Sequence, residues 1–421
     1  MSFWTRLLGN GDKKYSLNDG VMFDTWYIVL PAILTVIGLI AIYSSSIYVS
    51  VEKFGTETHY MLRQLGYCVI SIFIFMVLLN VSTQRWYDWG RWKIVLFVAV
   101  LSLLVVFVGR DINGAKRWLS LGFCNIQPSE FMKLSLILFV SGYIQRHHEE
   151  INSIWCNILV AIPIGIFLFI LMLQRDMGTM VIIGAILMVT LFIAGMQWKV
   201  IFAAGVLSLI GVLFLIQDPY RMGKITSFYN PFESRTGTGF QLCMSLIAIA
   251  KGGLWGQGLG NSEIKLSYIP EPHTDFIMSI VSEECGFIAV LVIFILELML
   301  IVRGFMMGFE ALNSKTDRNY FHGFCAIGIS TWFGVQCIIN MGVICALFPT
   351  KGLTMPFISY GGTSLISSVM AVCILLRISY ERKCSYFNRI RKAQMRYKQV
   401  NKRSHEGDRQ VAGNDNKILN S

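Results

Sequence analysis

The sequence predicts an all-α integral membrane protein with about ten transmembrane helices and one long extracytoplasmic loop. Hydrophobic residues make up 54% of the 421 residues and charged residues only 14%, whereas a soluble domain usually carries about 25% charged residues. Apolar runs near the length of a membrane span, roughly 20 residues, recur along the chain. Basic residues gather after the last run, as expected for a cytoplasmic tail near anionic lipid.

The candidate spans define the predicted domain organisation. They lie near 27–48, 65–81, 92–109, 129–145, 154–173, 177–196, 198–217, 275–302, 321–348 and 364–380. We expect a cytoplasmic N-terminal tail over 1–26, a polytopic membrane domain over 27–380 with a long outer loop over about 218–274, and a basic cytoplasmic tail over 381–421. The joints at 174–176 and 195–199 are so short that each could instead be a break within one helix.

Orientation follows from the lysines and arginines, because cytoplasmic loops collect positive charge during insertion. An even number of spans with both termini in the cytoplasm places these basic residues inside, together with the tail: Arg85, Arg91, Lys93, Arg146, Arg303, Lys315 and Arg318. It places these outside: Arg110, Lys116, Arg117, Lys224, Arg235, Lys251, Lys265 and Lys351. Insertion alone disfavours cations outside, so we expect them to serve function.

Composition excludes several other classes of protein. The formal charge of +11 does not indicate nucleic-acid binding, because the excess lies in the tail. The ten cysteines show no CxxC or Cys/His ligand spacing and mostly occur within apolar runs, so we expect neither a disulfide framework nor a protein metal site. The inverted halves of many transporters are not visible. In the long loop, Phe240–Ala250 has apolar residues at helical spacing, which predicts a short interfacial helix.

The segment from Ile269 to Phe276 enters a span at its outer boundary and carries the candidate general base, Asp275. A partly desolvated carboxylate there can accept a proton from a substrate hydroxyl. Its alternative role is to cap the helix N-terminus, as Thr274 also could. His273 is a supporting residue. Farther along the span, Glu283 and Glu284 are costly within a membrane, and we expect them to support the site through internal partners.

Two further segments carry polar groups. Lys116 and Arg117, beside a tryptophan, suit contacts with a phosphate, while the tryptophan alone suits an interfacial belt. Glu130 and Lys133 share a helix face and either neutralise each other or contact substrate. The segment 348–364 contains two prolines and three glycines with Lys351 and Ser359, which favours a lined anion-binding cavity over a simple turn. Outward cations and one boundary carboxylate suit an anionic lipid-linked substrate.

Four motifs in order resemble the SEDS family of bacterial cell-wall proteins: Gly114-Ala115-Lys116-Arg117-Trp118, Gln127-Pro128-Ser129-Glu130 with Lys133, Pro270 to Phe276, and Pro349-Thr350-Lys351-Gly352 through Gly362. The sequence of residues 349–357, Pro-Thr-Lys-Gly-Leu-Thr-Met-Pro-Phe, is more similar to the division branch of this family than to its elongation branch. Pro272 and the stretch Met278–Ser282 depart from the usual pattern, so they leave the fine geometry around Asp275 open.

The resemblance implies a ten-helix fold and a glycosyltransferase that polymerises lipid II into peptidoglycan strands on the outer face of the cytoplasmic membrane, at the division septum. The family's essential aspartate falls on Asp275, as base for the acceptor hydroxyl. Lys116, Arg117, Lys133, Lys351 or a divalent cation, Mg or Mn, would stabilise the leaving pyrophosphate. Implied partners are a class B penicillin-binding protein, other division membrane proteins and membrane lipid. The alternatives are a lipid II flippase, with Glu130, Glu283 and Glu284 as stepping stones, and a non-catalytic division scaffold.

Overall fold

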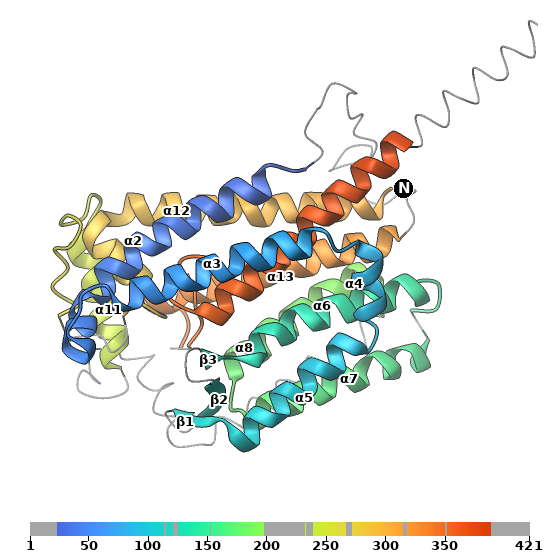
Figure 1. Ribbon diagram of the computed structural model, residues 1–421, viewed down its shortest axis with the longest axis horizontal. Helices are drawn as coiled ribbons and strands as arrows, with labels where there is room; N and C mark the ends of the chain where they lie inside the picture. Colours follow the sequence, from blue (N-terminus) through green and yellow to red (C-terminus); the bar gives the residue numbers. More distant parts are fainter. Residues whose placement is uncertain are drawn as a thin grey trace, which may run out of the picture.

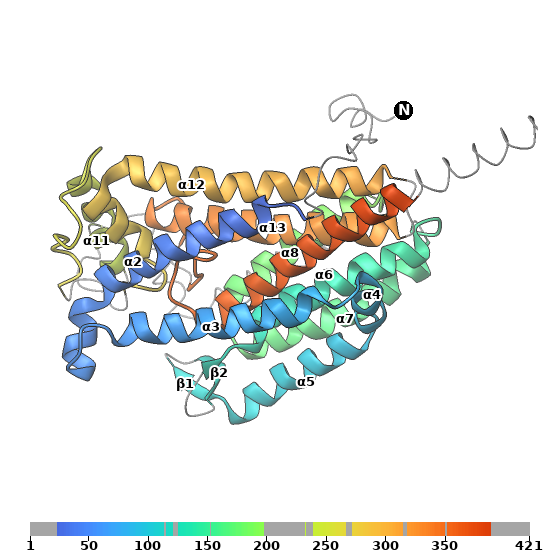
Figure 2. The same ribbon diagram turned by 45° about the horizontal axis from the view of Figure 1, so that its top comes forward.

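The computed structural model describes residues 23–112, 115–120, 125–151, 153–197, 232, 239–266, 272–314, 318–349 and 352–388. These residues form an elongated bundle whose long helices run roughly along one axis (Figures 1 and 2). The helices are α2 (Trp26–Phe54), α3 (His59–Leu79), α4 (Thr83–Trp89), α5 (Lys93–Val108), α6 (Pro128–His147), α7 (Ile154–Leu173), α8 (Met177–Ile193), α11 (Phe240–Gly252), α12 (Ile277–Leu312), α13 (Asn319–Ile344) and a last helix, Gly362–Asn388.

The described helices confirm the predicted membrane protein. Five are long and apolar enough to cross a membrane, namely α2, α3, α12, α13 and the last helix, and a sixth span results if α4 and α5, bent by 56°, are taken together. α8 and the apolar part of α7 are shorter. α6 is weakly apolar but almost entirely buried, because neighbouring helices shield it from lipid. The predicted span 198–217 lies outside the described residues; the other predicted spans coincide with these helices, with shifted ends.

α13 is the central helix of the bundle. It contacts α12, α6, α8 and α11, and its side chains Trp332, Phe321 and Phe324 are buried. The peripheral helices α3 and α5 instead expose large apolar residues such as Phe73 and Phe107. Such apolar outer faces suit contact with lipid, where burial in the protein is not needed to remove them from water.

The first and last described helices meet at one end of the bundle, which we call the tail end. The rings of Phe23 and Tyr380 stack with centroids 4.9 Å apart, and the backbone N–H of Thr83 donates to Glu381 at 2.9 Å. The predicted cytoplasmic groups near α4 therefore lie beside the start of α2 and the end of the last helix. The opposite end, the loop end, carries α11, a small sheet and the turn 352–361 (Figure 1).

The sheet was not predicted from sequence. Strands β1 (Arg110–Ile112), β2 (Ala115–Ser120) and β3 (Asn125–Ile126) pair antiparallel in the order β1-β2-β3. They are too short for an alternating pattern to distinguish them from loop. The sheet places Lys116 and Arg117 at the loop end, between α5 and α6.

α12 is broken at Gly286, whose φ of 80° and ψ of 179° are not helical. The break frees backbone groups, and the segment after α11 satisfies them: Phe287 N donates to Gly253 O at 2.9 Å, and Gly258 N donates to Glu284 O at 2.9 Å. A Cβ at position 286 would lie 2.4 Å from the backbone N of Gly256. Glycine is therefore required here, and the break fixes the short first part of α12 against the loop end.

Candidate functional site

Asp275 lies at the loop end, just before α12, and is partly exposed. α12 begins at Ile277, and Phe276 rather than Asp275 occupies the N-cap position. A Cβ placed on Gly352 would lie 3.3 Å from Asp275 Oδ2. The turn that contains Gly352 and Leu353 therefore passes directly beside the carboxylate.

Asn340 of α13 joins the two segments that meet at Asp275. Its Nδ2 donates to Asp275 O at 3.0 Å and to Leu353 O at 2.8 Å. Two carbonyl partners settle the orientation of the amide, because only the NH₂ group can donate to both. Asn340 Oδ1 is buried and has no hydrogen-bond partner among the residues that the structure describes. Sequence reasoning missed this residue, although an asparagine within an apolar run was a usable signal.

Gln336 lies one turn from Asn340 on α13 and was also missed. Its Nε2 donates to Thr354 O at 2.6 Å, while its Oε1 accepts from Lys133 Nζ at 3.2 Å and from Trp332 Nε1 at 2.6 Å. The pair Gln336 and Asn340 thus holds consecutive carbonyls of the turn at Leu353 and Thr354. An i, i+4 pair of amides on the central helix is the scaffold on which this turn is held.

Glu130 and Lys133 form a buried ion pair inside the bundle. Lys133 Nζ lies 2.8 Å from Glu130 Oε2 and 4.5 Å from the centroid of the Trp332 ring. Ser367 Oγ donates to Glu130 Oε2 at 3.2 Å. Internal pairing is the arrangement observed here, and it connects α6 through Gln336 to the turn beside Asp275. A direct contact of either residue with substrate stays a prediction.

The two cations of the sheet differ in their surroundings. Arg117 Nη2 donates to Arg175 O at 2.5 Å, and its Nη1 lies 3.9 Å from Asp176 Oδ1. Asp176 also accepts from Ser129 Oγ at 3.0 Å, so Arg117 fastens the sheet to the α7–α8 connection and the start of α6. Lys116 is exposed. Of these two side chains, Lys116 is therefore better placed to meet an anion.

His273, two residues before Asp275, packs against two tyrosines. Its ring centroid lies 4.2 Å from that of Tyr60 and 5.2 Å from that of Tyr360, and its carbonyl accepts from Tyr360 N at 2.9 Å. Burial, aided by the Lys53 cation, lowers the pKa of His273 to about 3, so the ring is neutral. This aromatic cluster suits the predicted supporting role.

The remaining predicted residues of the 348–364 segment have distinct outcomes. Ser359 Oγ accepts from Met355 N at 2.9 Å, and Ser359 N donates to Met355 O at 3.1 Å. The side chain is buried and closes a turn, so substrate contact by Ser359 stays a prediction without geometric support. Lys351 lies outside the described residues.

Glu283 and Glu284 have the internal partners expected of supporting residues. Ser262 Oγ donates to Glu283 Oε2, and Glu263 N donates to Glu283 Oε1 at 3.2 Å. Lys265 Nζ lies 2.8 Å from Glu284 Oε1, which also accepts from Ser44 Oγ at 2.7 Å. Both carboxylates therefore hold the segment after α11 against the first part of α12.

The described residues offer no group of three or more His, Cys, Asp or Glu side chains that could hold a metal ion. A partly exposed carboxylate with a fixed backbone, beside a glycine that leaves it open, is instead suited to accept a proton from a bound hydroxyl.

Comparison with known proteins identifies the family. The model of the FtsW, RodA and SpoVE family, described as cell cycle proteins, matches residues 24–384. This chain belongs to that family. A relative from Haemophilus influenzae, named probable peptidoglycan glycosyltransferase FtsW, is 40% identical over 391 residues, covering 91% of this chain and 97% of the relative. A relative of the same name from Coxiella burnetii is 37% identical and covers 85% and 96%.

Solved structures share the fold. A chain from a study titled "Structural coordination of polymerization and crosslinking by a peptidoglycan synthase complex" superposes with a TM-score of 0.68 at 24% identity, over 86% of this chain and 98% of that one. The crystal structure of the rod shape determining protein RodA from Thermus thermophilus gives a TM-score of 0.62 at 24% identity with the same coverage. The all-α membrane fold predicted from sequence is thereby confirmed.

Proposed function

We propose that this chain is a septal peptidoglycan glycosyltransferase that polymerises lipid II at the outer face of the bacterial cytoplasmic membrane. The observation that carries the proposal is the carboxylate of Asp275, partly exposed at the loop end, with its backbone fixed by Asn340 and Gly352 beside it. Relatives named probable peptidoglycan glycosyltransferase, 40% identical over nearly the whole chain, support the reaction class.

In the proposed reaction, Asp275 accepts the proton of the acceptor sugar hydroxyl as that oxygen attacks the anomeric carbon of the donor. The new glycosidic C–O bond forms while the bond from the anomeric carbon to undecaprenyl pyrophosphate breaks, and the pyrophosphate carries away the electron pair. Negative charge develops on the leaving group, where exposed cations lower the barrier. Lys116 is the described candidate, and Lys351 stays a candidate from sequence.

A divalent cation, Mg or Mn, stays a proposal. The three-ligand group that would bind it as a resident ion is not found among the side chains described, so no catalytic step is assigned to it. Such an ion would arrive on the substrate's pyrophosphate, for which it is a suitable counter-ion.

The proposal includes orientation and partners. With the tail end in the cytoplasm, Asp275 faces the outside, where the positive-inside rule does not explain its neighbouring cations. We place the chain at the division septum with a class B penicillin-binding protein and other division proteins. The likeness to a chain from a study of a synthase complex that coordinates polymerisation and crosslinking supports a crosslinking partner.

The flippase and scaffold alternatives have less support. A transport path needs polar groups that a moving substrate can reach, but Glu130, Glu283 and Glu284 are each engaged by other side chains. A scaffold would not need a partly exposed carboxylate whose backbone carbonyl is held by a buried amide.

The deciding experiment is polymerisation of purified lipid II by the full chain with its partner. We expect Asp275→Asn to lose polymerisation by at least about 100-fold, as removal of a general base does, while folding and partner binding persist. Asp88→Asn is the matched control, because this exposed aspartate lies on α4 at the tail end. Wild-type polymerisation by Asp275→Asn would show that another group is the base.

A further inference from the structure

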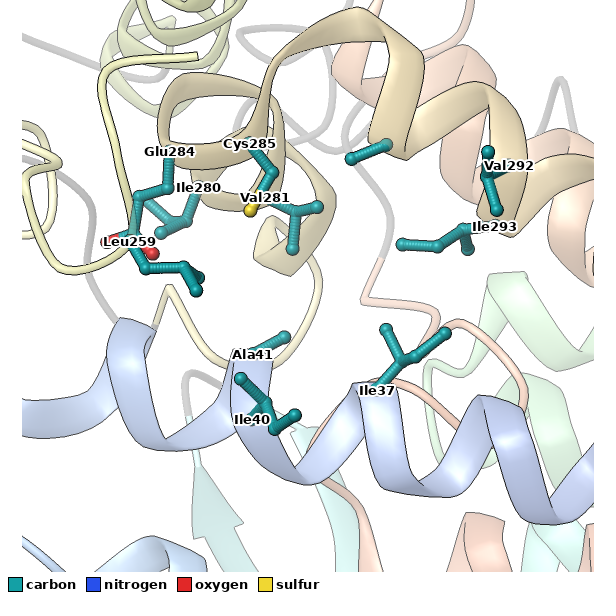
Figure 3. A pocket seen from close by; sticks show the side chains of 11 residues that line it. Ile37, Ile40, Ala41, Leu259, Ile280, Val281, Glu284, Cys285, Val292 and Ile293 are labelled. Carbon is teal, nitrogen blue, oxygen red and sulfur yellow. The ribbon is translucent and has the colours of Figure 1, made fainter. Parts of the chain in front are cut away.

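A cavity of about 310 Å³ lies between α2 and α12 (Figure 3). Its lining is apolar apart from Glu284 and Cys285. The volume is at the lower end of the range of ligand pockets, roughly 300–1,000 Å³. Protein interiors are otherwise close-packed, so a space of this size calls for an occupant.

The break in α12 determines where the cavity lies. Its lining residues on α12 lie on both sides of Gly286, from Ile280 to Ile293, and Leu259 of the segment after α11 lies at one end (Figure 3). Because Gly286 has a φ of 80° and no room for a Cβ, the break is fixed by backbone pairing. The cavity is therefore a built feature of the fold.

The cavity opens toward lipid. Among its lining residues, Ile40 is 53% and Val292 49% exposed, whereas Ile280 and Ile293 are 1% and 3% exposed. The first two mark the mouth and the second two the floor. Both mouth residues belong to helices long and apolar enough to cross a membrane, so the mouth faces hydrocarbon, and a lipid chain is the fitting occupant.

The one carboxylate in the lining does not oppose such a chain. Glu284 Oε1 is 2.8 Å from Lys265 Nζ, and Ser44 Oγ donates to both carboxylate oxygens at 2.7 and 2.6 Å. The charge of Glu284 is therefore paired with Lys265, and Ser44 provides a further hydrogen bond. A hydrocarbon chain meets the apolar walls without stranding an ion.

We infer that this cavity holds the head-group end of the polyprenyl chain of the lipid-linked substrate, an inference that rests on the proposed function. Ile280 and Val281 on its floor follow Asp275 by about one and a half helical turns. A chain seated there leaves its pyrophosphate at the loop end, where Asp275 lies. The cavity thus contributes to orienting the substrate as well as to retaining it.

Photo-crosslinking in the membrane tests the occupant. A photo-reactive amino acid replaces Ile40 at the mouth or, as a control, Val36, which is 57% exposed on the same helix and does not line the cavity. We expect lipid II to crosslink at least about tenfold more at position 40 than at position 36, with excess undecaprenyl pyrophosphate abolishing the difference. Equal labelling, or mainly phospholipid adducts at position 40, would overturn the inference.

A variant that fills the cavity tests whether the cavity contributes to substrate binding. Ala41→Phe projects a ring into the cavity, and we expect it to raise the KM for lipid II about tenfold with kcat little changed, whereas Val36→Phe changes neither. An unchanged KM in folded Ala41→Phe would contradict the inference, and if this variant does not fold, crosslinking at position 40 decides. Crosslinking is repeated in Asp275→Asn, so that failure of the catalytic assignment is distinguished from failure of the cavity assignment.

Discussion

Replacing Asn340 with leucine removes the amide that joins Asp275 to the turn at Leu353. The leucine side chain has similar size but no donor, so the carbonyls of Asp275 and Leu353 lose bonds of 3.0 and 2.8 Å. A buried acceptor left without a partner costs about 1–3 kcal/mol. The same change removes Oδ1, a buried acceptor without a partner among the described residues, which offsets part of that loss. We expect a net destabilisation of about 1–3 kcal/mol, which a folded membrane protein can tolerate.

The catalytic effect should be larger than the effect on stability. Without the amide, the backbone of Asp275 can move relative to Gly352, and a displacement near 1 Å costs about 100-fold in rate, or about 2.7 kcal/mol. Asn340 is buried and so is not placed to contact lipid II, and we therefore expect kcat to fall while KM stays within about threefold. Because the base itself is retained, the pH dependence of the residual activity should keep its wild-type shape.

The assay is polymerisation of lipid II by the purified chain with its partner, with kcat and KM measured separately and folding checked by thermal unfolding in detergent. Ser330→Ala is the matched control. Ser330 is buried on the same helix and donates only to Ala326 O of its own helix, at 2.8 Å. If Asn340→Leu polymerises within threefold of wild type, the amide does not position Asp275 and the reasoning fails.

Three further predictions concern stability. Gly286→Ala should prevent folding or lower the unfolding temperature by more than about 10 °C, because its Cβ would lie 2.4 Å from backbone atoms. Gly184→Ala is the control and should be neutral, because a Cβ at position 184 meets no described atom within 4 Å. A stable Gly286→Ala variant would contradict the described break. Lys265→Met should destabilise by about 3–5 kcal/mol by leaving Glu284 buried without its cation, and adding Glu284→Gln should restore much of the loss in denaturant unfolding. Burial lowers the pKa of His273 from 6.5 to about 3 in the folded protein, so the contribution of the neutral ring to stability is present above pH 6.5 and is lost as the pH falls toward 3. His273→Phe should therefore reduce the loss of stability in acid. An unfolding temperature with the same pH dependence in His273→Phe and wild type would refute this prediction.

The predicted spans that fall within the described residues were confirmed, because each depends on local composition. Runs such as 154–173 contain enough apolar residues to specify a helix of membrane length without knowledge of neighbours. α6 was also found, although its buried polar residues weaken the pattern. The small sheet was missed, because its strands are stabilised by pairing between segments and by the Arg117 contacts with the α7–α8 connection.

The candidate site was predictable only in part, for a physical reason. Asp275 stood out because it is a carboxylate at the outer boundary of a predicted span, where partial desolvation favours a role as a general base. Asn340 acts through hydrogen bonds to the carbonyls of Asp275 and Leu353, 65 and 13 residues away in the sequence. No local sequence pattern predicts such partners. Arg117 was expected to contact an anion, yet its guanidinium is engaged by Arg175 O and lies near Asp176, a partner that sequence spacing could not reveal.

The acidic residues of α12 favour catalysis at a fixed site over passage through the bundle. Glu283 and Glu284 lie just before the break at Gly286, and each holds the segment after α11. A substrate moving past them would have to displace Ser262 and Lys265, and so uncouple the segment that completes the broken helix. These buried contacts are better explained as a means of keeping the region around Asp275 rigid. A general base is effective only when its carboxylate stays within hydrogen-bond reach of the substrate.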